Sequence, residues 1–489
     1  MSIAATHGVT LDNGLTADRR LLSPDQFEMA HEVLAKAKAA GLETIRLAFV
    51  DQHGVPRGKA ITVESLASVF RNGMAMTSTL LLKDTSHRTV FDVWAGDIGF
   101  GEGQLTGAGD VLIVPDPATF RILPWSPHSA SILCDLYHKD GSFMPFCSRG
   151  ILKRAVSALE KTGRQLVCGL EVEFYVFRID NPRLDHADGG MPAAVPETSL
   201  LSHGFQYLTD ARYDALEDVM DHLRRAAQAL QLPVRSMEAE FGPSQFEFTF
   251  EPDSPLAHAD AMVTFRTMVK QVCRRHGLHA TFMCRPRVDN AVPSGWHLHQ
   301  SLVDTATGRN LFIPADGGTV SKEASGWIGG LLAHAEESCL LTTPTVNGYK
   351  RYQPNQMAPD RVQWGKDNKG AMIRGLMAPG DKASRIENRV AEPAANPYLF
   401  FASQIYSGLD GLDRGLEAPA PVENPYKSNA SALPRSLLGA VELFEKSEFY
   451  RNKLGPEFVA YLSHIKRAEW DRYLMTVSEW EQREYFSLF

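Results

Sequence analysis

Polar residues alternate with apolar ones in four short stretches of the sequence, and their types could bind metal ions and phosphate. Side chains two positions apart lie on the same face of a strand. The stretches are GLEVEF with Glu171 and Glu173, EFGPSQFEF with Glu240 and Glu247, WHLHQS with His297, His299 and Ser301, and RIENR with Arg385, Glu387 and Arg389. Each stretch alone is typical of a solvated strand face. Together they predict a sheet with one strongly polar face.

The chemistry of such a face follows from its charges. Carboxylates that converge need cations to offset their mutual repulsion. Ligands rich in oxygen, with few imidazoles, suit Mg²⁺ or Mn²⁺ better than Zn²⁺. Arginines between them suit phosphate groups. We therefore expect a nucleotide bound with divalent cations. The sequence contains neither GxxxxGK[ST] nor GxGxxG, so this would be neither a P-loop nor a Rossmann site.

The elements that must position these residues can be read from periodicity and turn signals. Residues 23–41 predict a helix that is capped by Ser23, and residues 44–63 predict a hairpin. Residues 109–125 and 129–137 predict further strands. A stretch rich in Gly, Ser and Pro then predicts a domain boundary near residue 145.

After this boundary the pattern alternates short strands with helices. Helical spacing recurs at 212–231, at 258–277 and over the last ~70 residues. We interpret the aromatic residues of that last segment, Trp470, Trp480 and Tyr485, as packing residues.

Composition bounds the class of protein. The chain has 489 residues, a length that predicts two domains. Its net charge of −8 gives no indication of nucleic-acid binding. Its six cysteines contain no CxxC pair and predict buried thiols in a reducing compartment. The first 14 residues lack the pattern of a signal peptide, and no apolar run approaches the ~18 residues of a membrane helix. We expect a cytoplasmic protein without a membrane partner.

The chain resembles the glutamine synthetase family over nearly its full length. The matching stretches are FVDQHGVPRGKA, DVLIVPDPATFRILPW, GLEVEF, GPSQFEF, SGWHLHQSL, NGYKRY and SRIENRVAEPAANPYLF, in this order. The resemblance implies an α+β fold. Residues 1–145 would form an N-terminal β-grasp domain with a leading helix. Residues 146–489 would form a larger catalytic domain with a curved antiparallel sheet flanked by helices. It also implies a ring-shaped homo-oligomer of 12 subunits, or of 6 or 10, with active sites between neighbouring subunits.

The family chemistry implies ATP-dependent ligation, in which ATP phosphorylates the γ-carboxylate of glutamate and an amine displaces the phosphate. ATP and two or more Mg²⁺ or Mn²⁺ ions would be the cofactors. One metal would be held by Glu173, Glu240 and Glu247, and the second by Glu171, His297 and Glu387. ATP would contact His299, Ser301, Lys382 and Arg385. Arg351 and Arg389 would bind the acid substrate. Arg374 would stabilise the transferring phosphoryl group, so that Arg374, Arg351 and Glu387 form the catalytic set.

Two departures from the family pattern bear on the amine. Typical members carry an Asp in the first domain that helps to hold ammonium. In this sequence Thr77 lies at about the position of that Asp, and Asp84 follows seven residues later. Typical members also have a flap PGYEAP whose Glu takes a proton from ammonium. Here residues 354–359 read PNQMAP, which puts Met357 at that position. A thioether neither attracts a cation by charge nor accepts a proton at neutral pH. We therefore expect an organic amine, alkyl or aryl, and a γ-glutamylamide product.

Two further departures affect the acid substrate. Val292 and Pro293 replace an Asn-Gly pair that typical members use to hold glutamate, although Asn290 lies nearby. Lys369 replaces an Arg, which keeps the charge but loses the bidentate fork. Since Arg351 and Arg389 remain, glutamate stays the preferred acid.

Four functions are ranked on these residues. The first is a γ-glutamylamide synthetase that serves amine catabolism or nitrogen metabolism, the branch that the chain resembles most. The second is glutamine synthetase proper, whose ammonium groups would come from elsewhere, such as Asp84 or Asp360. The third is a non-catalytic relative, and the fourth is a guanidino phosphotransferase.

Overall fold

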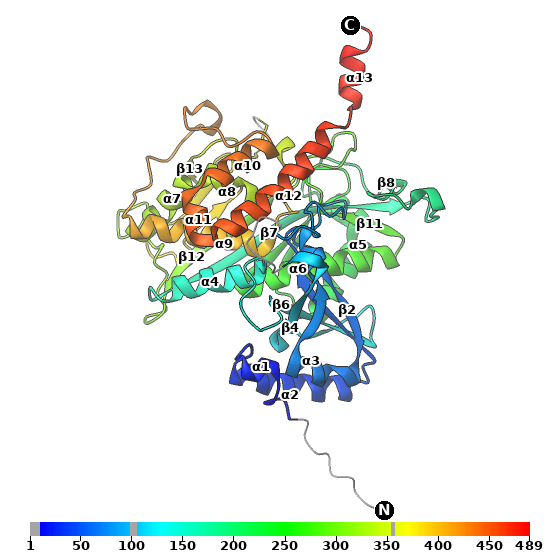
Figure 1. Ribbon diagram of the computed structural model, residues 1–489. Helices are drawn as coiled ribbons and strands as arrows, with labels where there is room; N and C mark the ends of the chain where they lie inside the picture. Colours follow the sequence, from blue (N-terminus) through cyan, green and yellow to red (C-terminus); the bar gives the residue numbers. More distant parts are fainter. Residues whose placement is uncertain (1–9, 98–104, 354–356) are drawn as a thin grey trace, which may run out of the picture.

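The computed structural model describes residues 10–97, 105–353 and 357–489 (Figure 1). The first nine residues, on which the expectation about a signal peptide partly depends, lie outside the described residues. Helices and strands build two sheets, and helices α1 and α13 lie at opposite ends of the molecule (Figure 1). The mixed helix-and-sheet class predicted from the sequence is confirmed.

The first sheet has the strand order β2-β1-β6-β4-β3, and β5 pairs with β6. Strands β1 and β6 run parallel, and the other neighbours run antiparallel. The predicted hairpin is confirmed as β1 and β2, whose turn is held by the Asp51 carboxylate, which accepts from the backbone N–H groups of His53 and Val55. The bounds are β1 (Thr44–Val50), β2 (Pro56–Thr62), β3 (Met74–Thr77), β4 (Asp110–Pro115), β5 (Arg121–Ile122) and β6 (Ser129–Tyr137).

Three helices accompany this sheet. The predicted capped helix is confirmed: α2 follows Ser23, whose hydroxyl accepts from the Gln26 N–H while the Gln26 side chain accepts from the Ser23 N–H. Such a reciprocal capping box satisfies two backbone donors that would otherwise lack partners. The bounds are α1 (Leu15–Asp18), α2 (Pro24–Ala39) and α3 (Leu66–Asn72).

The second sheet has the order β13-β14-β15-β12-β7-β10-β9, and β8 and β11 pair with β7. Its neighbours are antiparallel, as expected, except for β13 and β14, which run parallel. The bounds are β7 (Arg164–Ile179), β8 (Thr198–Leu200), β9 (Val234–Ala239), β10 (Gln245–Asp253), β11 (Leu278–Thr281), β12 (Trp296–Asp304), β13 (Trp364–Lys366), β14 (Ile373–Leu376) and β15 (Arg385–Asn388).

Helices cover the apolar face of this second sheet. Phe174 of β7 and Phe248 of β10 contact Phe265 of α6, with ring centroids 5.9 and 5.2 Å apart. Trp296 of β12 packs edge-on against Phe400 of α9. The helices after the first sheet are α4 (Ser148–Glu160), α5 (Asp210–Ala229), α6 (Pro255–Arg275), α7 (Lys322–Ala333), α8 (Ala335–Thr342), α9 (Pro397–Asp413), α10 (Leu437–Lys446), α11 (Glu448–Leu454), α12 (Pro456–Leu474) and α13 (Glu479–Tyr485).

A buried arginine joins the two sheets. The Arg149 guanidinium, on α4, binds Asp135 of β6, Asp116 after β4 and Asp260 of α6, at 3.1, 2.9 and 2.8 Å. Burial opposes its charge, yet the Asp135 and Asp260 carboxylates raise the pKa of Arg149 well above its usual value. One side chain therefore ties the first sheet to helices of the second.

The C-terminal segment contradicts one interpretation made from the sequence. Trp470 packs against the hydrophobic core as expected, whereas Trp480 and Tyr485 contact each other rather than the core and are 61% and 47% exposed. Phe489, which contacts Tyr485, is 95% exposed. Helix α13 projects away from the body of the molecule (Figure 1). A single sequence does not tell whether aromatic side chains pack on their own chain or on another one. Among the described residues, no helix is long and apolar enough to cross a bilayer.

Candidate active site

Strand register brings the polar residues of the second sheet together. In the central strand β7, Glu171 stands opposite His297 of β12, and Glu173 stands opposite Glu247 of β10. On the other side of β12, His299 stands opposite Glu387 of β15. Because residues opposite one another on antiparallel strands share a face, these side chains form one continuous polar row.

The same row extends over the edge strands. Arg374 of β14 stands opposite Glu387 of β15. Two predicted members lie one residue outside their strands: Glu240 follows β9 and Arg389 follows β15. Both still reach the site, since Glu240 and Arg389 line one cavity with Glu173 and Glu247.

Glu171 lies between the two histidines. Its Oε1 is 2.8 Å from Nε2 of His299, and its Oε2 is 3.2 Å from Nδ1 of His297. Burial favours the neutral acid, but the hydrogen bonds from both imidazoles hold the pKa of Glu171 far below its usual range. Burial and the nearby Arg389 charge lower the pKa of His297 to about 4. An anionic carboxylate beside a neutral imidazole is the protonation state that a divalent cation requires of its ligands.

A second group of carboxylates is held close together. Burial and the adjacent Glu240 charge raise the pKa of Glu173 to about 8. Burial and the Glu173 charge likewise raise the pKa of Glu247. Gln245 donates to Glu173 at 3.1 Å and so fixes its orientation. These acids repel one another, which is the arrangement that a bound cation would relieve.

Within residues 10–97, 105–353 and 357–489, three sets of side chains bring ligand atoms within 4.8 Å of one another: Glu171, Glu247 and His297; Glu171, His299 and Glu387; and Glu238, Glu240 and Glu247. They include the predicted ligands other than Glu173 and add His299 and Glu238. Glu173 stays close, since its Oε1 is 3.9 Å from Nε2 of His297. The donors are mostly carboxylate oxygens, so the site fits hard divalent cations such as Mg²⁺ or Mn²⁺.

Glu387 is fully buried between two arginines and a histidine. Arg389 contacts one of its oxygens, Arg374 donates to the other at 3.1 Å, and His297 Nδ1 lies 3.5 Å away. Burial opposes ionisation, yet the Arg389 charge holds the pKa of Glu387 below its usual value. Arg374 is shared, because it also binds Asp367 at 2.5 Å.

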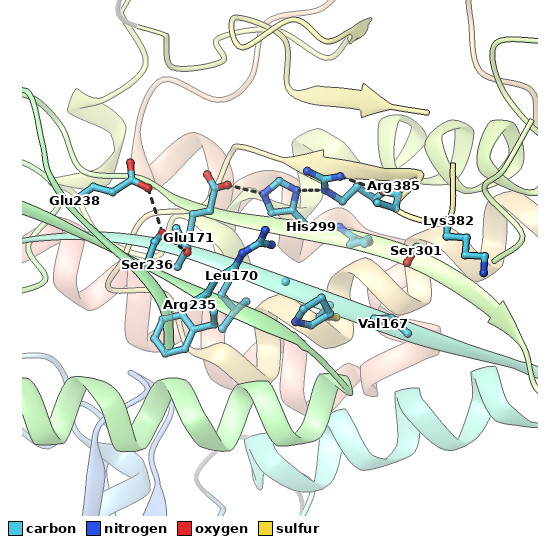
Figure 2. Close-up of a pocket in the computed structure, with 17 residues that line it drawn as sticks. Val167, Leu170, Glu171, Arg235, Ser236, Glu238, His299, Ser301, Lys382 and Arg385 are labelled. Carbon is cyan, nitrogen blue, oxygen red and sulfur yellow. Dashed lines mark hydrogen bonds and ion pairs between the residues drawn. The ribbon is translucent and has the colours of Figure 1, made fainter. Parts of the chain in front are cut away.

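Two cavities meet at Glu171. The first, of about 540 Å³, is lined by the four predicted nucleotide contacts, His299, Ser301, Lys382 and Arg385. Figure 2 shows Glu171, His299 and Arg385 in a row, with Lys382 and Ser301 beyond them. Arg385 donates to Nδ1 of His299 at 3.2 Å.

The second cavity, of about 460 Å³, is lined by Arg351 and Arg374 of the predicted catalytic set and by the residues predicted for the acid substrate, while Glu387 lies buried behind Arg374 and Arg389. Its cationic residues are Arg351, Lys369, Arg374 and Arg389. The Arg351 guanidinium is buried and donates to the backbone oxygens of Arg389 and Val390, so its position is fixed. Met357 lines the same cavity with a left-handed backbone (φ 50°). The other predicted flap positions, 354–356, lie outside the described residues.

Sequence reasoning missed several lining residues. Glu238 lies in the metal-binding region, and the alternation MEAEF of Glu238 and Glu240 could have indicated it. Tyr207 and Phe241 line the second cavity, and no periodic pattern pointed to them. Both come from segments between regular elements, where the sequence gives no spacing rule.

The position of Asp84 weakens one alternative source of an ammonium site. Asp84 is 2% exposed, accepts from the backbone N–H groups of Ser86 and Arg88, and pairs with Arg472 at 3.2 Å. A carboxylate with these partners stabilises the local loop and is not free to bind ammonium. Thr77, at the end of β3, is exposed and caps the next turn through the Thr79 N–H.

Comparisons with known proteins agree with this geometry. The family model described as glutamine synthetase, catalytic domain, matches residues 145–485. A gamma-glutamylanilide synthase of Acinetobacter sp is 42% identical over 487 residues, covering 96% of this chain and 97% of that protein. A glutamine synthetase of Methanosarcina mazei is 32% identical over 470 residues, covering 94% and 97%. A solved GmaS/ADP complex matches with a TM-score of 0.77 at 27% identity, covering 93% and 99%.

Proposed function

The chain belongs to the glutamine synthetase family, and from this premise we propose that it is an ATP-dependent ligase for glutamate and an organic amine. The γ-carboxylate of L-glutamate takes the γ-phosphoryl group of ATP, and the amine nitrogen then displaces phosphate to give a γ-glutamylamide and ADP. One observation carries the choice of amine. The second cavity has the acids and arginines of a ligase but presents Met357 where typical members place a carboxylate for ammonium.

The nucleotide is assigned to the first cavity. Ser301, Lys382 and Arg385 line it together with His299, and Glu171 lines both this cavity and the second one. Cationic and hydroxyl donors of this kind bind phosphate oxygens. The γ-phosphoryl group would therefore face the second cavity.

Two or more Mg²⁺ or Mn²⁺ ions are assigned to the acidic sets around Glu171 and Glu247. When bound, such ions neutralise charge on the phosphoryl group. The protein contributes their orientation, because Gln245 fixes Glu173 and the two histidines fix Glu171.

Arginines supply the remaining charge. Arg374, held between Glu387 and Asp367, is placed to stabilise the transferring phosphoryl group. Arg351 and Arg389, with Lys369 nearby, suit the carboxylate of glutamate. Positioning by these fixed side chains, rather than acid–base chemistry, accounts for most of the expected rate enhancement.

We also propose a ring-shaped homo-oligomer, of twelve subunits in preference to six or ten. The C-terminal segment supports subunit contacts, since a chain rarely leaves so many large apolar side chains in water. The exposed side chains before, within and after α13 include Leu474, Met475, Val477, Trp480, Phe486, Leu488 and Phe489. Light scattering should give the mass of twelve chains, and deletion of residues 476–489 should give a smaller particle.

We place the domain boundary near residue 145. We place the protein in the cytoplasm, where its six buried, free thiols stay reduced.

The deciding experiment measures phosphate release from ATP and glutamate with ammonium, alkylamines, anilines and polyamines. The proposal expects release to depend on an organic amine and the γ-glutamylamide to be found by mass spectrometry. Equal or better turnover with ammonium at physiological concentrations would instead identify a glutamine synthetase.

A further inference from the structure

One wall of the second cavity is apolar, and the proposed chemistry so far gives it no task. It consists of Tyr207, Leu208, Phe241, Val292, Pro293 and Met357. The positive charge that a dicarboxylic acid such as glutamate needs is already supplied by the arginines of the same cavity. An apolar wall does not stabilise glutamate or an ammonium ion, because burying such charges against hydrocarbon costs free energy. The wall is therefore available to the amine.

Two of these apolar residues have stacked rings. The rings of Tyr207 and Phe241 lie parallel, with centroids 4.2 Å apart and an interplanar angle of 10°. Phe241 directly follows Glu240, and its backbone N–H donates to the Glu240 carboxylate at 3.0 Å. The stacked pair thus stands beside the acids of the proposed reaction centre.

Backbone contacts hold both rings in place. The Phe205 N–H donates to the Phe241 carbonyl at 2.7 Å, which joins the segment of Tyr207 to that of Phe241. Phe205, Gln206 and Leu208 all have left-handed backbones, with φ of 66°, 58° and 58°. Backbone of this kind in non-glycine residues costs free energy and is concentrated at functional sites. Burial and the Glu240 charge raise the pKa of Tyr207, so its phenol stays neutral.

The remaining side of the wall is equally fixed. The Tyr175 hydroxyl donates to the Val292 carbonyl at 2.6 Å and accepts from the Val292 N–H at 2.9 Å. Pro293 follows, with its restricted backbone. These apolar residues are therefore held in place, and the flat face of a stacked ring suits a planar guest.

Resting on the ligase assignment above, we propose that the acceptor is a primary arylamine, whose ring lies against the stacked Tyr207 and Phe241 side chains. Arylamines are largely neutral at pH 7. The nitrogen lone pair forms the C–N bond to the γ-carbonyl carbon of the acyl phosphate, the carbon–oxygen bond to phosphate breaks, and one N–H proton leaves to phosphate or water. The absence of a carboxylate at Met357 then costs the enzyme little, since no ammonium must be deprotonated first.

The test compares aniline with cyclohexylamine, a ring of similar size that is cationic and not aromatic, and with ammonium. We expect kcat/KM for aniline to exceed both by at least roughly tenfold. Tyr207→Leu and Phe241→Leu should each lower the ratio of aniline to cyclohexylamine kcat/KM by about threefold to tenfold, the range that aromatic stacking supplies. Tyr207→Phe keeps the ring and should retain the preference for aniline.

Two results would overturn the arylamine assignment alone. Cyclohexylamine or ammonium could be used as well as aniline, or the leucine variants could lower turnover of aniline and cyclohexylamine equally, which marks a merely structural role. The absence of glutamate-dependent ADP release with every amine would instead overturn the ligase proposal, and the arylamine assignment with it. ADP binding by calorimetry checks that each variant is folded.

Discussion

Oε1 of Glu171 lies 2.8 Å from Nε2 of His299, and this contact connects the two cavities of the site. The other oxygen of the same carboxylate faces Nδ1 of His297 at 3.2 Å. Both histidines therefore contact the Glu171 carboxylate, but their other neighbours differ. His299 accepts a hydrogen bond from Arg385, whereas His297 lies near Glu387 and Arg351.

The two histidines should respond differently to substitution. His297→Ala removes an imidazole from the acidic centre and should raise the Mg²⁺ concentration needed for half-maximal activity, by roughly tenfold or more. His299→Ala frees Arg385 in the nucleotide cavity and should chiefly raise the KM for ATP. Titrations of Mg²⁺ and of ATP on both variants measure this split. Equal Mg²⁺ dependence in the two variants would contradict it.

Arg374 should affect the chemical step. Its guanidinium is held by Glu387 at 3.1 Å and by Asp367 at 2.5 Å, so it is in place before substrate binds. Removing a preorganised cation that faces developing charge lowers kcat by roughly 10²–10³-fold. Arg374→Ala should therefore lower kcat far more than it raises the KM for ATP. Arg374→Lys, which keeps the charge without the fork, should recover part of the loss. A pure KM effect would place this residue in ground-state binding.

Met357→Glu should move the enzyme towards ammonium. Met357 is 46% exposed and lines the second cavity, so a carboxylate there stays solvated and close to the acceptor. Hydrogen bonds to charged groups contribute about 1.5–3 kcal/mol, which predicts a rise of roughly tenfold or more in kcat/KM for ammonium. The matched control is Met357→Gln, which has the same side-chain length as Glu without its charge. An equal gain in both variants would exclude an electrostatic cause.

Glu392 should make stability depend on pH. It is 1% exposed and accepts from the backbone N–H and the hydroxyl of Thr345, both at 2.9 Å. Burial raises the pKa of Glu392 to about 7 from its usual 4.5. The folded state thus holds a proton that the unfolded state releases, so stability contributed by this group falls as pH rises from about 4.5 to about 7.

Glu392→Gln stays neutral at every pH and should remove this loss. The variant should match the wild type near pH 4.5 and be more stable by about 1–3 kcal/mol at pH 8. Denaturant unfolding at several pH values measures the difference. A constant difference across pH would show that packing, rather than ionisation, separates the two proteins.

The sequence predicts the strands of this site better than its loops. Glu171, Glu173, His297 and His299 alternate at strand spacing, and the register places them on one face as expected. Tyr207 and Phe241 were missed, because they lie between regular elements, where there is no period to detect. Trp480 was wrongly interpreted as a packing residue, because its apolar character is equally compatible with contact to another chain.

The division between strands and loops has a consequence for how this enzyme could change over evolution or in the laboratory. Reactive groups stand on hydrogen-bonded strands, where a change disturbs the neighbouring strand as well. The residues proposed to lie beside the acceptor, Tyr207, Leu208, Val292 and Met357, stand outside the strands. Substrate range can therefore drift while reactivity is preserved. A library of variants at these four positions should yield ligases for new amines that still phosphorylate the acid substrate with ATP.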